Sequence, residues 1–309
     1  MDFELNEDQR MLAQTVANFA KNESPVERFR KLRDDDIGYD PATWAKMGEL
    51  GWLGVAFPEE VGGFGGSFVD CALVLENLAA TLVPEPYLAS VVLGGMTLLQ
   101  AGSPEQHAAY LTPMIEGETT LALAHSEAQS RYDVSSIESV AAPNDGGYEL
   151  SGTKVWVLNG HNADHLIVSA KAPGGVSLFV VPRDADGVSV KVAKTIDGQK
   201  AALVELDSVA VPGEARLGEE GSGAAVLERT MDYAAAAAVA EGVGLASTML
   251  HMTVEYLGTR EQFGVKIGSF QALQHRAVDM YAESELLRSI SMASMLRADE
   301  EDASARRAD

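Results

Sequence analysis

The chain has 309 residues, 46% of them hydrophobic, so it is long enough for two or three modest domains with full cores. Acidic residues outnumber basic ones by 46 to 23, and the net charge of −23 argues against nucleic acid or an anionic membrane as the main partner. No apolar run approaches the roughly 20 residues that span a bilayer, and the acidic start carries no signal-peptide pattern.

Cysteine and motif content narrow the chemistry. The single cysteine, Cys71, excludes an intramolecular disulfide framework, suits the cytoplasm and is expected in the core. The chain has no G-x-G-x-x-G, Walker A, H-E-x-x-H, C-x-x-C or G-x-S-x-G pattern, and its six histidines lack metal-ligand spacing. Any nucleotide cofactor must therefore be held by something other than a Rossmann turn.

Residues 1 to about 118 have a helical pattern. Asn6 and Gln9 form a possible capping box for the first helix. The segment Gly51–Gly66 is too rich in glycine for a helix and too apolar for a flexible linker, which is the alternative, so we expect a shaped loop. Further helices are expected at about 41–50, 68–82, 86–101 and 104–116.

Residues 119 to about 212 change character. Short runs rich in Val, Ile and Leu alternate with turn residues, which is typical of a β-sandwich or barrel. A-P-N-D-G-G, Ala142 to Gly147, is a hairpin signal. The expected strands are 120–125, 147–151, 154–158, 164–169, 177–181, 188–194 and 201–205.

Residues 222 to 309 return to helix. The run 225–257 contains five successive alanines, Ala234 to Ala238, which favour helix and allow a neighbouring helix to approach closely. A second helix is expected over about 269–297, followed by a charged end. Because two helices cannot easily bury both faces, this region is expected to be an incomplete bundle.

The connection between these two helices, Tyr256 to Gln271, carries unusual side chains. Arg260 supplies a fixed cation, Phe263 an aromatic face and Gln271 a terminal amide, a set suited to gripping a phosphorylated aromatic ligand. The alternative is a basic loop that merely ends a helix.

Three motifs resemble the acyl-CoA dehydrogenase family. They are R-x-x-F-G with F-Q seven residues after the phenylalanine, the glycine-rich segment with Pro58-Glu59, and T-K-V-W-V-L-N-G from Thr153. The resemblance covers essentially the whole chain and is to the group that includes the small subunit of pimeloyl-CoA dehydrogenase. It implies an α+β multidomain fold: an N-terminal helical domain (1–118), a middle β domain (119–212) and the first two helices of a C-terminal bundle (222–309), with the remainder of the bundle expected beyond residue 309.

The resemblance also implies FAD as cofactor. Leu123, His125, Ser126 and Tyr132 would lie at the flavin pyrimidine ring, where hydrogen-bond donors stabilise the negative charge of the reduced flavin. Tyr132 would also meet the substrate. The family's proline and glycines in this loop are replaced by Ala128, Gln129 and Arg131. The alternative is an ordinary loop at the edge of a sheet.

The family resemblance implies roles for further residues. Trp156 would stack beside the flavin, although a strand tryptophan is often plain core, and Leu158 replaces a threonine expected opposite the reacting flavin nitrogen. Arg260, Phe263 and Gln271 would reach the FAD of a neighbouring chain. Asp232 would lie near the acyl-CoA cleft.

The catalytic base is the main departure. Ala234 and Ala235 stand where some members have a glutamate followed by an arginine. Glu241, the only carboxylate between Tyr233 and Leu250, shares the helix face of Ala234 and becomes the candidate base. The alternative is a polar contact at a helix interface.

The resemblance implies dehydrogenation of an acyl-CoA to the trans-2-enoyl-CoA, with electrons passing to an electron-transferring flavoprotein. A homodimer or homotetramer, or a heterotetramer with a larger homologous subunit, would be the assembly. The losses at Ala234, Ala235 and Leu158 leave open a non-catalytic or regulatory partner subunit, and flavin monooxygenation is a third alternative. We expect a cytoplasmic protein with no nucleic acid partner and no membrane span.

Overall fold

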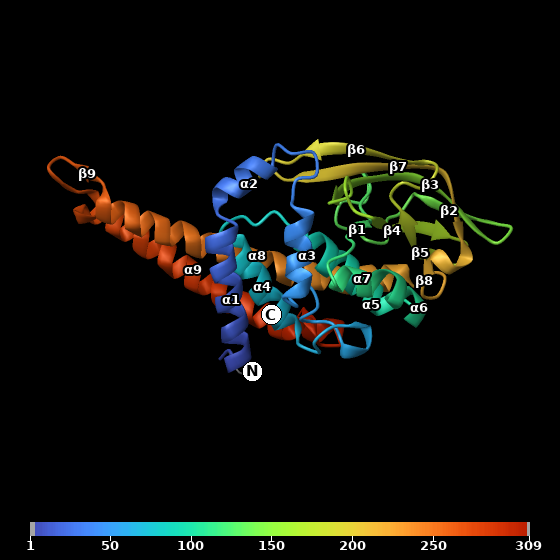
Figure 1. Cartoon of the computed structure of the whole chain (residues 1–309), viewed down its shortest axis with the longest axis horizontal. Helices are drawn as coiled ribbons and strands as arrows, with labels where there is room; N and C mark the ends of the chain where they lie inside the picture. Colours follow the sequence, from blue (N-terminus) through green and yellow to red (C-terminus); the bar gives the residue numbers. More distant parts are fainter. Residues whose placement is uncertain (1–3, 308–309) are drawn as a thin grey trace. The chain divides into compact units, whose positions relative to one another are not determined.

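The computed structural model describes residues 4–307, which form two compact units. One comprises residues 4–28, 67–83 and 235–307, and the other comprises residues 29–66 and 84–234. The expected order of helical, β and helical regions is observed, so the predicted fold class is confirmed (Figure 1). The domain limits given above stay a prediction, because the two units follow contacts rather than chain order.

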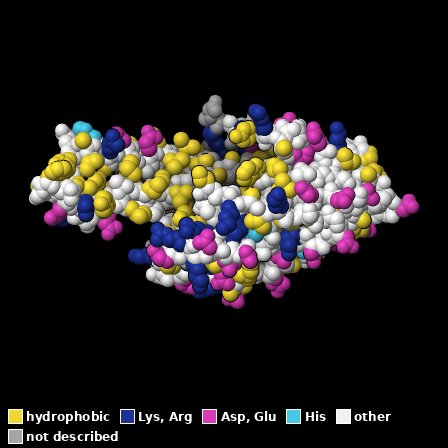
Figure 2. Space-filling model, turned by 90° about the horizontal axis from the view of Figure 1, so that it is seen from above, with side chains coloured by type: hydrophobic (Ala, Val, Ile, Leu, Met, Phe, Trp, Pro, Cys, Tyr) yellow, Lys and Arg dark blue, Asp and Glu magenta, His cyan; other side chains and the backbone are white. Residues whose placement is uncertain are grey.

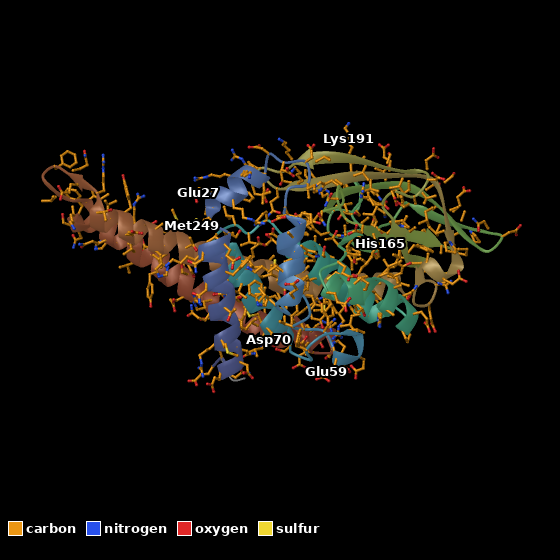
Figure 3. All side chains as sticks on the ribbon, viewed as in Figure 1. Glu27, Glu59, Asp70, His165, Lys191 and Met249 are labelled. Atoms are coloured by element: carbon orange, nitrogen blue, oxygen red, sulfur yellow. The ribbon has the colours of Figure 1, made fainter. Side chains whose placement is uncertain are left out.

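In the described part of the chain, four α-helices precede the π-helical segments, and α1, α3 and α4 begin at side-chain caps. They are α1 (Glu7–Glu23), α2 (Val26–Leu32), α3 (Pro41–Glu49) and α4 (Phe68–Ala79). The predicted capping box is confirmed, since Gln9 N donates to Asn6 Oδ1 at 2.8 Å and Asn6 N donates to Gln9 Oε1 at 3.2 Å. A second box was missed: Ser67 N donates to Asp70 Oδ2 at 2.8 Å at the start of α4. Asp70 is labelled in Figure 3. Cys71 is buried in α4, as expected.

The glycine-rich segment 51–66 is a shaped loop, as predicted, and not a linker. Its backbone closes on itself, with Phe64 N donating to Gly54 O at 3.1 Å and Gly66 N to Val55 O at 3.0 Å. Phe57 is fully buried, whereas Phe64 is exposed.

The expected helices at 86–101 and 104–116 are interrupted by π-helical turns. The first consists of η2 (Leu88–Gly95) and α5 (Met96–Ala101), and the second of α6 (Pro104–Gln106), η3 (His107–Leu111) and α7 (Thr112–Ile115). In η2 the buried Ser90 Oγ donates to Leu121 O at 2.9 Å and accepts from Leu121 N at 3.1 Å. This contact fixes the first strand against the helical segment.

The β region forms one eight-stranded sheet in the order β6-β7-β3-β2-β4-β5-β8, with β1 parallel to β4. Two predicted strands, 147–151 and 154–158, are wrong as separate elements, because a single strand runs through both, and a shift in its pairing with β7 between Leu150 and Gly152 is accommodated by an extra residue in β7. Strand β2 was missed because Pro143 and Asn144 are typical of turns. The strands are β1 (Leu121–Ala124), β2 (Val140–Asn144), β3 (Gly147–Leu158), β4 (His165–Ala172), β5 (Gly175–Pro182), β6 (Val188–Lys194), β7 (Lys200–Pro212) and β8 (Arg216–Leu217).

Strands from both halves of this sheet share one core. Leu150 of β3, Val168 of β4, Phe179 of β5 and Val204 of β7 are all buried in the same cluster. Tyr148 and Phe179 meet edge to face with ring centroids 5.0 Å apart. The sheet therefore folds over its own apolar face, in the manner of the predicted sandwich. The predicted hairpin is also confirmed, since Asn144 pairs with Gly147 across a two-residue turn.

The last helical elements lie in the unit that comprises residues 4–28, 67–83 and 235–307, except for residues 223–234 of α8, which belong to the unit that contains the sheet. They are α8 (Gly223–Thr259), a small hairpin of β9 (Glu261–Gln262) and β10 (Val265–Lys266), η5 (Ile267–Ser269), α9 (Gln271–Ala298) and α10 (Ala303–Arg306). Arg288 on α9 donates to Glu76 Oε1 of α4 at 3.1 Å and to Ser247 Oγ of α8 at 3.0 Å. By length and composition alone α8 could cross a membrane, a test that core helices of soluble proteins also pass.

The pair α8 and α9 carries exposed apolar side chains, visible as hydrophobic surface in Figure 2. They include Met249, Met252, Val254, Val278, Tyr281 and Ile290. A groove of about 810 Å³ runs between the two helices and is lined by Leu250, Val254, Val278 and Tyr281, among others.

Two glycines of α8 give a matched test of helix packing. A Cβ atom at Gly244 would lie 2.0 Å from the Glu76 carbonyl oxygen of α4, whereas a Cβ at Gly242 would meet no atom within 4 Å. We expect Gly244→Ala to lower the free energy of unfolding by about 1–3 kcal/mol, because α4 and α8 must separate. Gly242→Ala should raise it by up to about 1 kcal/mol through helix propensity. Urea denaturation of both variants checks this, and equal effects would contradict the close packing.

Candidate functional site

Two predicted segments that are distant in sequence lie side by side in the β unit. Val155 N, in β3, donates to Ser126 O at 2.9 Å. The segment that follows β1 is thereby held against the part of β3 that precedes Trp156. The structure thus places His125 and Ser126 beside the strand that carries Trp156 and Leu158.

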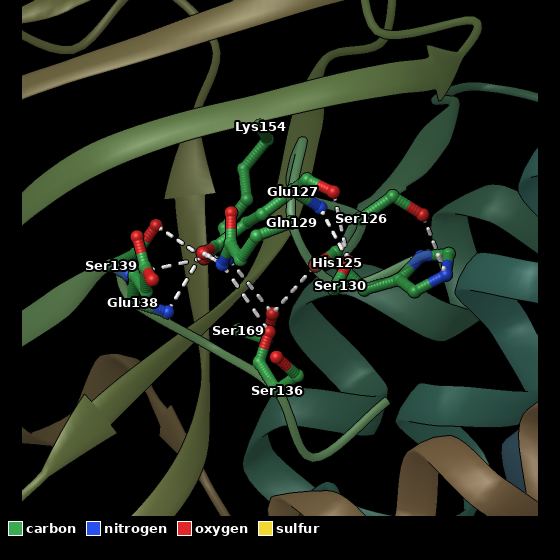
Figure 4. A network of polar contacts seen from close by, with 10 residues as sticks. All are labelled: His125, Ser126, Glu127, Gln129, Ser130, Ser136, Glu138, Ser139, Lys154 and Ser169. Atoms are coloured by element: carbon green, nitrogen blue, oxygen red, sulfur yellow. Dashed lines mark hydrogen bonds and ion pairs between the residues drawn. The ribbon is translucent and has the colours of Figure 1, made fainter. Parts of the chain in front are cut away.

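A buried ion pair locks the same two segments together. Lys154 Nζ lies 2.5 Å from Glu127 Oε1 and donates to Ser169 Oγ of β4 at 3.1 Å (Figure 4). Lys154 is 0% exposed and Glu127 is 5% exposed. Since the alternation of β3 turns Lys154 inward, its charge can be satisfied only by groups inside the unit.

The remaining hydrogen-bonding capacity of Glu127 organises the loop that follows. Its Oε1 accepts from Ser139 Oγ at 2.6 Å and from Ser139 N at 3.1 Å, and its Oε2 accepts from Glu138 N at 2.7 Å and from Gln129 Nε2 at 2.6 Å. One carboxylate therefore holds both ends of the loop from Glu127 to Ser139.

The charges of the pair follow from these contacts. Burial alone would raise the pKa of Glu127, but hydrogen bonds from Lys154, Ser139, Gln129 and the Glu138 amide lower it to about 2. Burial lowers the pKa of Lys154 to about 8, against the opposing effect of Glu127. Both groups are therefore charged at neutral pH, and the pair acts as a structural clamp.

Trp156 is presented outward by irregular backbone. A β-bulge interrupts the pairing of β3 with β7 between Lys154 and Val157, and Trp156 has a φ of +55°, an uncommon conformation for a bulky residue. The bulge lets Lys154 and Val157 both face the interior while Trp156 remains 67% exposed. Leu158 is also partly exposed at the end of the strand. The alternative of a core tryptophan is therefore wrong.

The predicted loop residues have different environments. Leu123 is buried in strand β1, whereas Tyr132 is fully exposed. His125 Nε2 lies 3.0 Å from Ser126 Oγ, and both residues are half-buried. Arg131, at a family glycine position, has a φ of +48°. The loop thus keeps a left-handed turn without the glycine.

The second predicted group lies on the connection between α8 and α9. Arg260 follows α8, Phe263 and Gly264 form the tip of the β9–β10 hairpin with φ values of +56° and +79°, and Gln271 begins α9. All three predicted side chains are exposed, Phe263 at 91%, and the Phe263 ring meets Phe270 edge to face at 6.1 Å. The hairpin was missed, although F-G with positive φ at both positions is the geometry of a tight hairpin turn.

Asp232 and Glu241 both lie on α8 and are half-buried. They fall in different units, Asp232 with the β unit and Glu241 with the helical one. Their predicted roles stay predictions.

The main residues missed by sequence reasoning are those of the ion pair and its partners. Glu127 directly follows an apolar strand, and Lys154 occupies an inward position of β3. A lysine on the apolar face of one strand, with a glutamate at the end of another, is the signal that could have paired them.

The exposed indole of Trp156 and the hydroxyl of Ser126 are the kinds of group that contact a flavin: an aromatic surface and a hydrogen-bonding group. Comparison with known proteins identifies the family of this chain. Residues 6–118, 122–209 and 221–309 match the N-terminal, middle and C-terminal domains of acyl-CoA dehydrogenase. The chain belongs to the acyl-CoA dehydrogenase family.

Individual relatives support this assignment. The probable acyl-CoA dehydrogenase YngJ of Bacillus subtilis is 32% identical over 299 residues, which cover 93% of this chain and 78% of YngJ. Butyryl-CoA dehydrogenase from Megasphaera elsdenii has a TM-score of 0.89 at 28% identity, covering 99% of this chain and 83% of that one. A chain from work on the electron transferring flavoprotein of Acidaminococcus fermentans has a TM-score of 0.91 at 30% identity, covering 99% and 82%.

FAD is the cofactor of the family. The FAD complex of PigA has a TM-score of 0.88 at 26% identity, covering 97% of this chain and 81% of that one. The ChsE4–ChsE5 complex from Mycobacterium tuberculosis has a TM-score of 0.88 at 30% identity, covering 97% and 80%. The chain covers 64% of the rice isovaleryl-CoA dehydrogenase, so it spans only part of the length of some relatives.

The ion pair predicts a specific acid sensitivity. The pKa of Glu127 is lowered from 4.5 to about 2, so its stabilising contribution is complete above pH 4.5 and is lost as the pH falls toward 2. We expect the unfolding free energy of the wild-type protein to fall over this range by up to about 3 kcal/mol more than that of Glu127→Gln. Denaturant unfolding at several pH values measures both curves. Parallel curves would show that Glu127 is not held as a charged group.

Proposed function

We propose that the protein catalyses FAD-dependent α,β-dehydrogenation of an acyl-CoA thioester to the trans-2-enoyl-CoA. The observation that carries the proposal is the joint presentation of Ser126 and Trp156, which the Lys154–Glu127 pair holds together in one place. When bound, FAD accepts the hydride that leaves the substrate β carbon. The residues of this chain bind and orient the two reactants and take up the α proton.

Ser126 and Trp156 would contact the flavin from the β unit. The hydroxyl of Ser126 supplies a hydrogen bond to the polar edge of the ring, and the exposed indole of Trp156 supplies an apolar surface. Arg260, Phe263 and Gln271 would hold the FAD of a neighbouring chain, which their exposure on the α8–α9 connection supports. Tyr132 and Asp232 are the proposed substrate contacts.

Glu241 is the proposed base. A carboxylate removes the α proton while the hydride leaves the β carbon, so the two electrons of the C–H bond at the β carbon leave with the hydride and the α C–H electrons form the new double bond. Glu241 is half-buried on α8, which supports a role in a site shielded from bulk water.

The assembly and the electron acceptor complete the proposal. The exposed apolar face of α8 and α9 supports an oligomer, either a homodimer or homotetramer or a heterotetramer with a larger homologous subunit. The likeness to the chain from the Acidaminococcus work supports an electron-transferring flavoprotein as partner. A cytoplasmic location belongs to the same proposal.

A non-catalytic or regulatory partner subunit is the second candidate. Ala234 and Ala235 replace the base and its neighbour, and Leu158 replaces the threonine opposite the reacting flavin nitrogen. The likeness to the ChsE4–ChsE5 complex supports an assembly of two different chains. Adding acyl-CoA to the FAD-loaded protein separates the candidates: bleaching of the flavin supports the dehydrogenase, and an unchanged flavin spectrum with every acyl-CoA supports the partner subunit.

Arg260 gives a test of cofactor binding. We expect Arg260→Ala to weaken FAD binding at least tenfold, because a charge-assisted hydrogen bond contributes about 1.5–3 kcal/mol. Flavin content in dilute protein and circular dichroism measure occupancy and folding. Arg276→Ala removes another exposed cation, on α9, and should leave FAD binding unchanged. Equal flavin content in all three proteins would refute the contact.

Glu241 gives a test of the chemistry. Glu241→Gln keeps the size and hydrogen-bonding capacity of the side chain but cannot take up the proton. We expect it to slow flavin reduction by acyl-CoA at least about 10²-fold, the lower end of general-base effects, without loss of FAD. Stopped-flow bleaching measures the rate, and Glu255→Gln on the exposed surface of α8 is the control. Reduction at the wild-type rate in the Glu241→Gln variant would make Glu241 structural.

A further inference from the structure

The loop at the proposed flavin contact contains a histidine that the proposed chemistry does not use. His125 Nε2 lies 3.0 Å from the hydroxyl oxygen of Ser126 (Figure 4). The main chain of this pair is fixed on both sides, since Ser169 Oγ donates to His125 O at 3.4 Å and Val155 N donates to Ser126 O at 2.9 Å. The imidazole and the hydroxyl are therefore held in contact by the strands around them.

The surroundings of His125 keep the imidazole neutral. Burial lowers its pKa, and the nearby ammonium group of Lys154 lowers it further, while the main chain of Leu123 acts in the opposite direction. The Nδ1 atom is shielded from solvent, and among residues 4–307 no group meets hydrogen-bond geometry with it, although the Leu123 main chain lies close enough to influence the pKa. Nε2 is the ring nitrogen that lies at hydrogen-bonding distance from Ser126 Oγ.

A serine hydroxyl has one proton and can rotate, so its direction depends on its neighbours. With Nε2 at hydrogen-bonding distance, the imidazole restricts the rotation of the Ser126 hydroxyl and fixes which of its hydrogen-bonding sites remains available to a ligand. A group placed in advance loses less entropy on binding than one that must be ordered by the ligand.

We propose that His125 is a positioning residue that orients the Ser126 hydroxyl toward bound FAD. The inference rests on the proposed function, because it concerns the flavin contact of Ser126. It predicts that His125 affects flavin binding through the hydroxyl of Ser126 and not through the volume of its ring.

A double-mutant cycle tests the proposal. FAD dissociation constants are measured for the wild-type protein, His125→Val, Ser126→Ala and the double variant. We expect His125→Val to weaken FAD binding about tenfold when Ser126 is present, the loss of one ordered hydrogen bond. In the Ser126→Ala background the same change should cost less than about twofold, because the hydroxyl that His125 orients is gone.

The flavin midpoint potential is a second readout. It should shift in His125→Val, while the double variant should match Ser126→Ala, since hydrogen bonds to the ring alter the stability of the reduced flavin. An equal loss of FAD affinity in both backgrounds, with additive shifts in potential, would overturn the proposal and leave His125 a packing residue.

Two conservative variants guard against a folding defect in His125→Val. The amide of glutamine reaches the position of Nε2, whereas that of asparagine reaches the position of Nδ1. His125→Gln should therefore keep FAD affinity within about threefold of wild type, and His125→Asn should lose about tenfold. Equal affinities for these two variants would also overturn the proposal. If the wild-type protein binds no FAD, the proposed function and this inference both fail; if FAD binds without coupling between the two residues, only the inference fails.

Discussion

The pair of Lys154 and Glu127 is the constraint on which the candidate site depends. Two charges buried in a β unit cannot separate without leaving each one desolvated and unpaired, which costs about 3–5 kcal/mol for the loss of one partner. The pair therefore does more than stabilise the folded protein. It forces the end of β1, the middle of β3 and the loop after Glu127 to keep one relative arrangement, because any other arrangement breaks the pair.

This constraint explains how the chain tolerates its departures from the family pattern. The loop lacks the usual proline and glycines, yet Arg131 still adopts a left-handed conformation with a φ of +48°. A flexible glycine is not needed where the loop ends are held by the Glu127 carboxylate. Gln129 also adds a contact that no glycine could make, since its amide donates to Glu127 Oε2 at 2.6 Å. Side-chain anchoring thus replaces backbone freedom as the determinant of the loop path.

The sequence predicted those features that depend on local physical chemistry. The capping box at Asn6, the hairpin turn before Gly147 and the shaped loop at 51–66 each follow from a few adjacent residues, and each was confirmed. The π-helical turns of η2 and the continuous strand β3 were not predicted, because both depend on contacts with distant elements. Strand β2 was not predicted because it contains Pro143, and it joins the sheet through its pairing with β3.

The candidate site likewise has a part that the sequence predicted and a part that it did not. Resemblance supplied its residues, and the structure placed Ser126 beside the strand that carries Trp156. The ion pair beneath them was missed, because its two members are 27 positions apart and neither is unusual alone. Lys154 follows the alternation of β3, but the bulge after it, which turns Trp156 outward, could not be predicted, since alternation assumes a regular strand. The roles proposed for the individual site residues stay predictions.

The position of Glu241 is determined by packing of a different kind. Gly244 allows α8 to approach α4 so closely that a Cβ atom would lie 2.0 Å from the Glu76 carbonyl oxygen. This contact fixes the rotation of α8 about its axis, because only the glycine face can meet α4 at that distance. Residue 241 lies three positions earlier, on the adjacent part of the helix surface. The close contact at Gly244 therefore constrains the part of α8 that carries Glu241, while the ion pair of the β unit constrains the segments that carry Ser126 and Trp156.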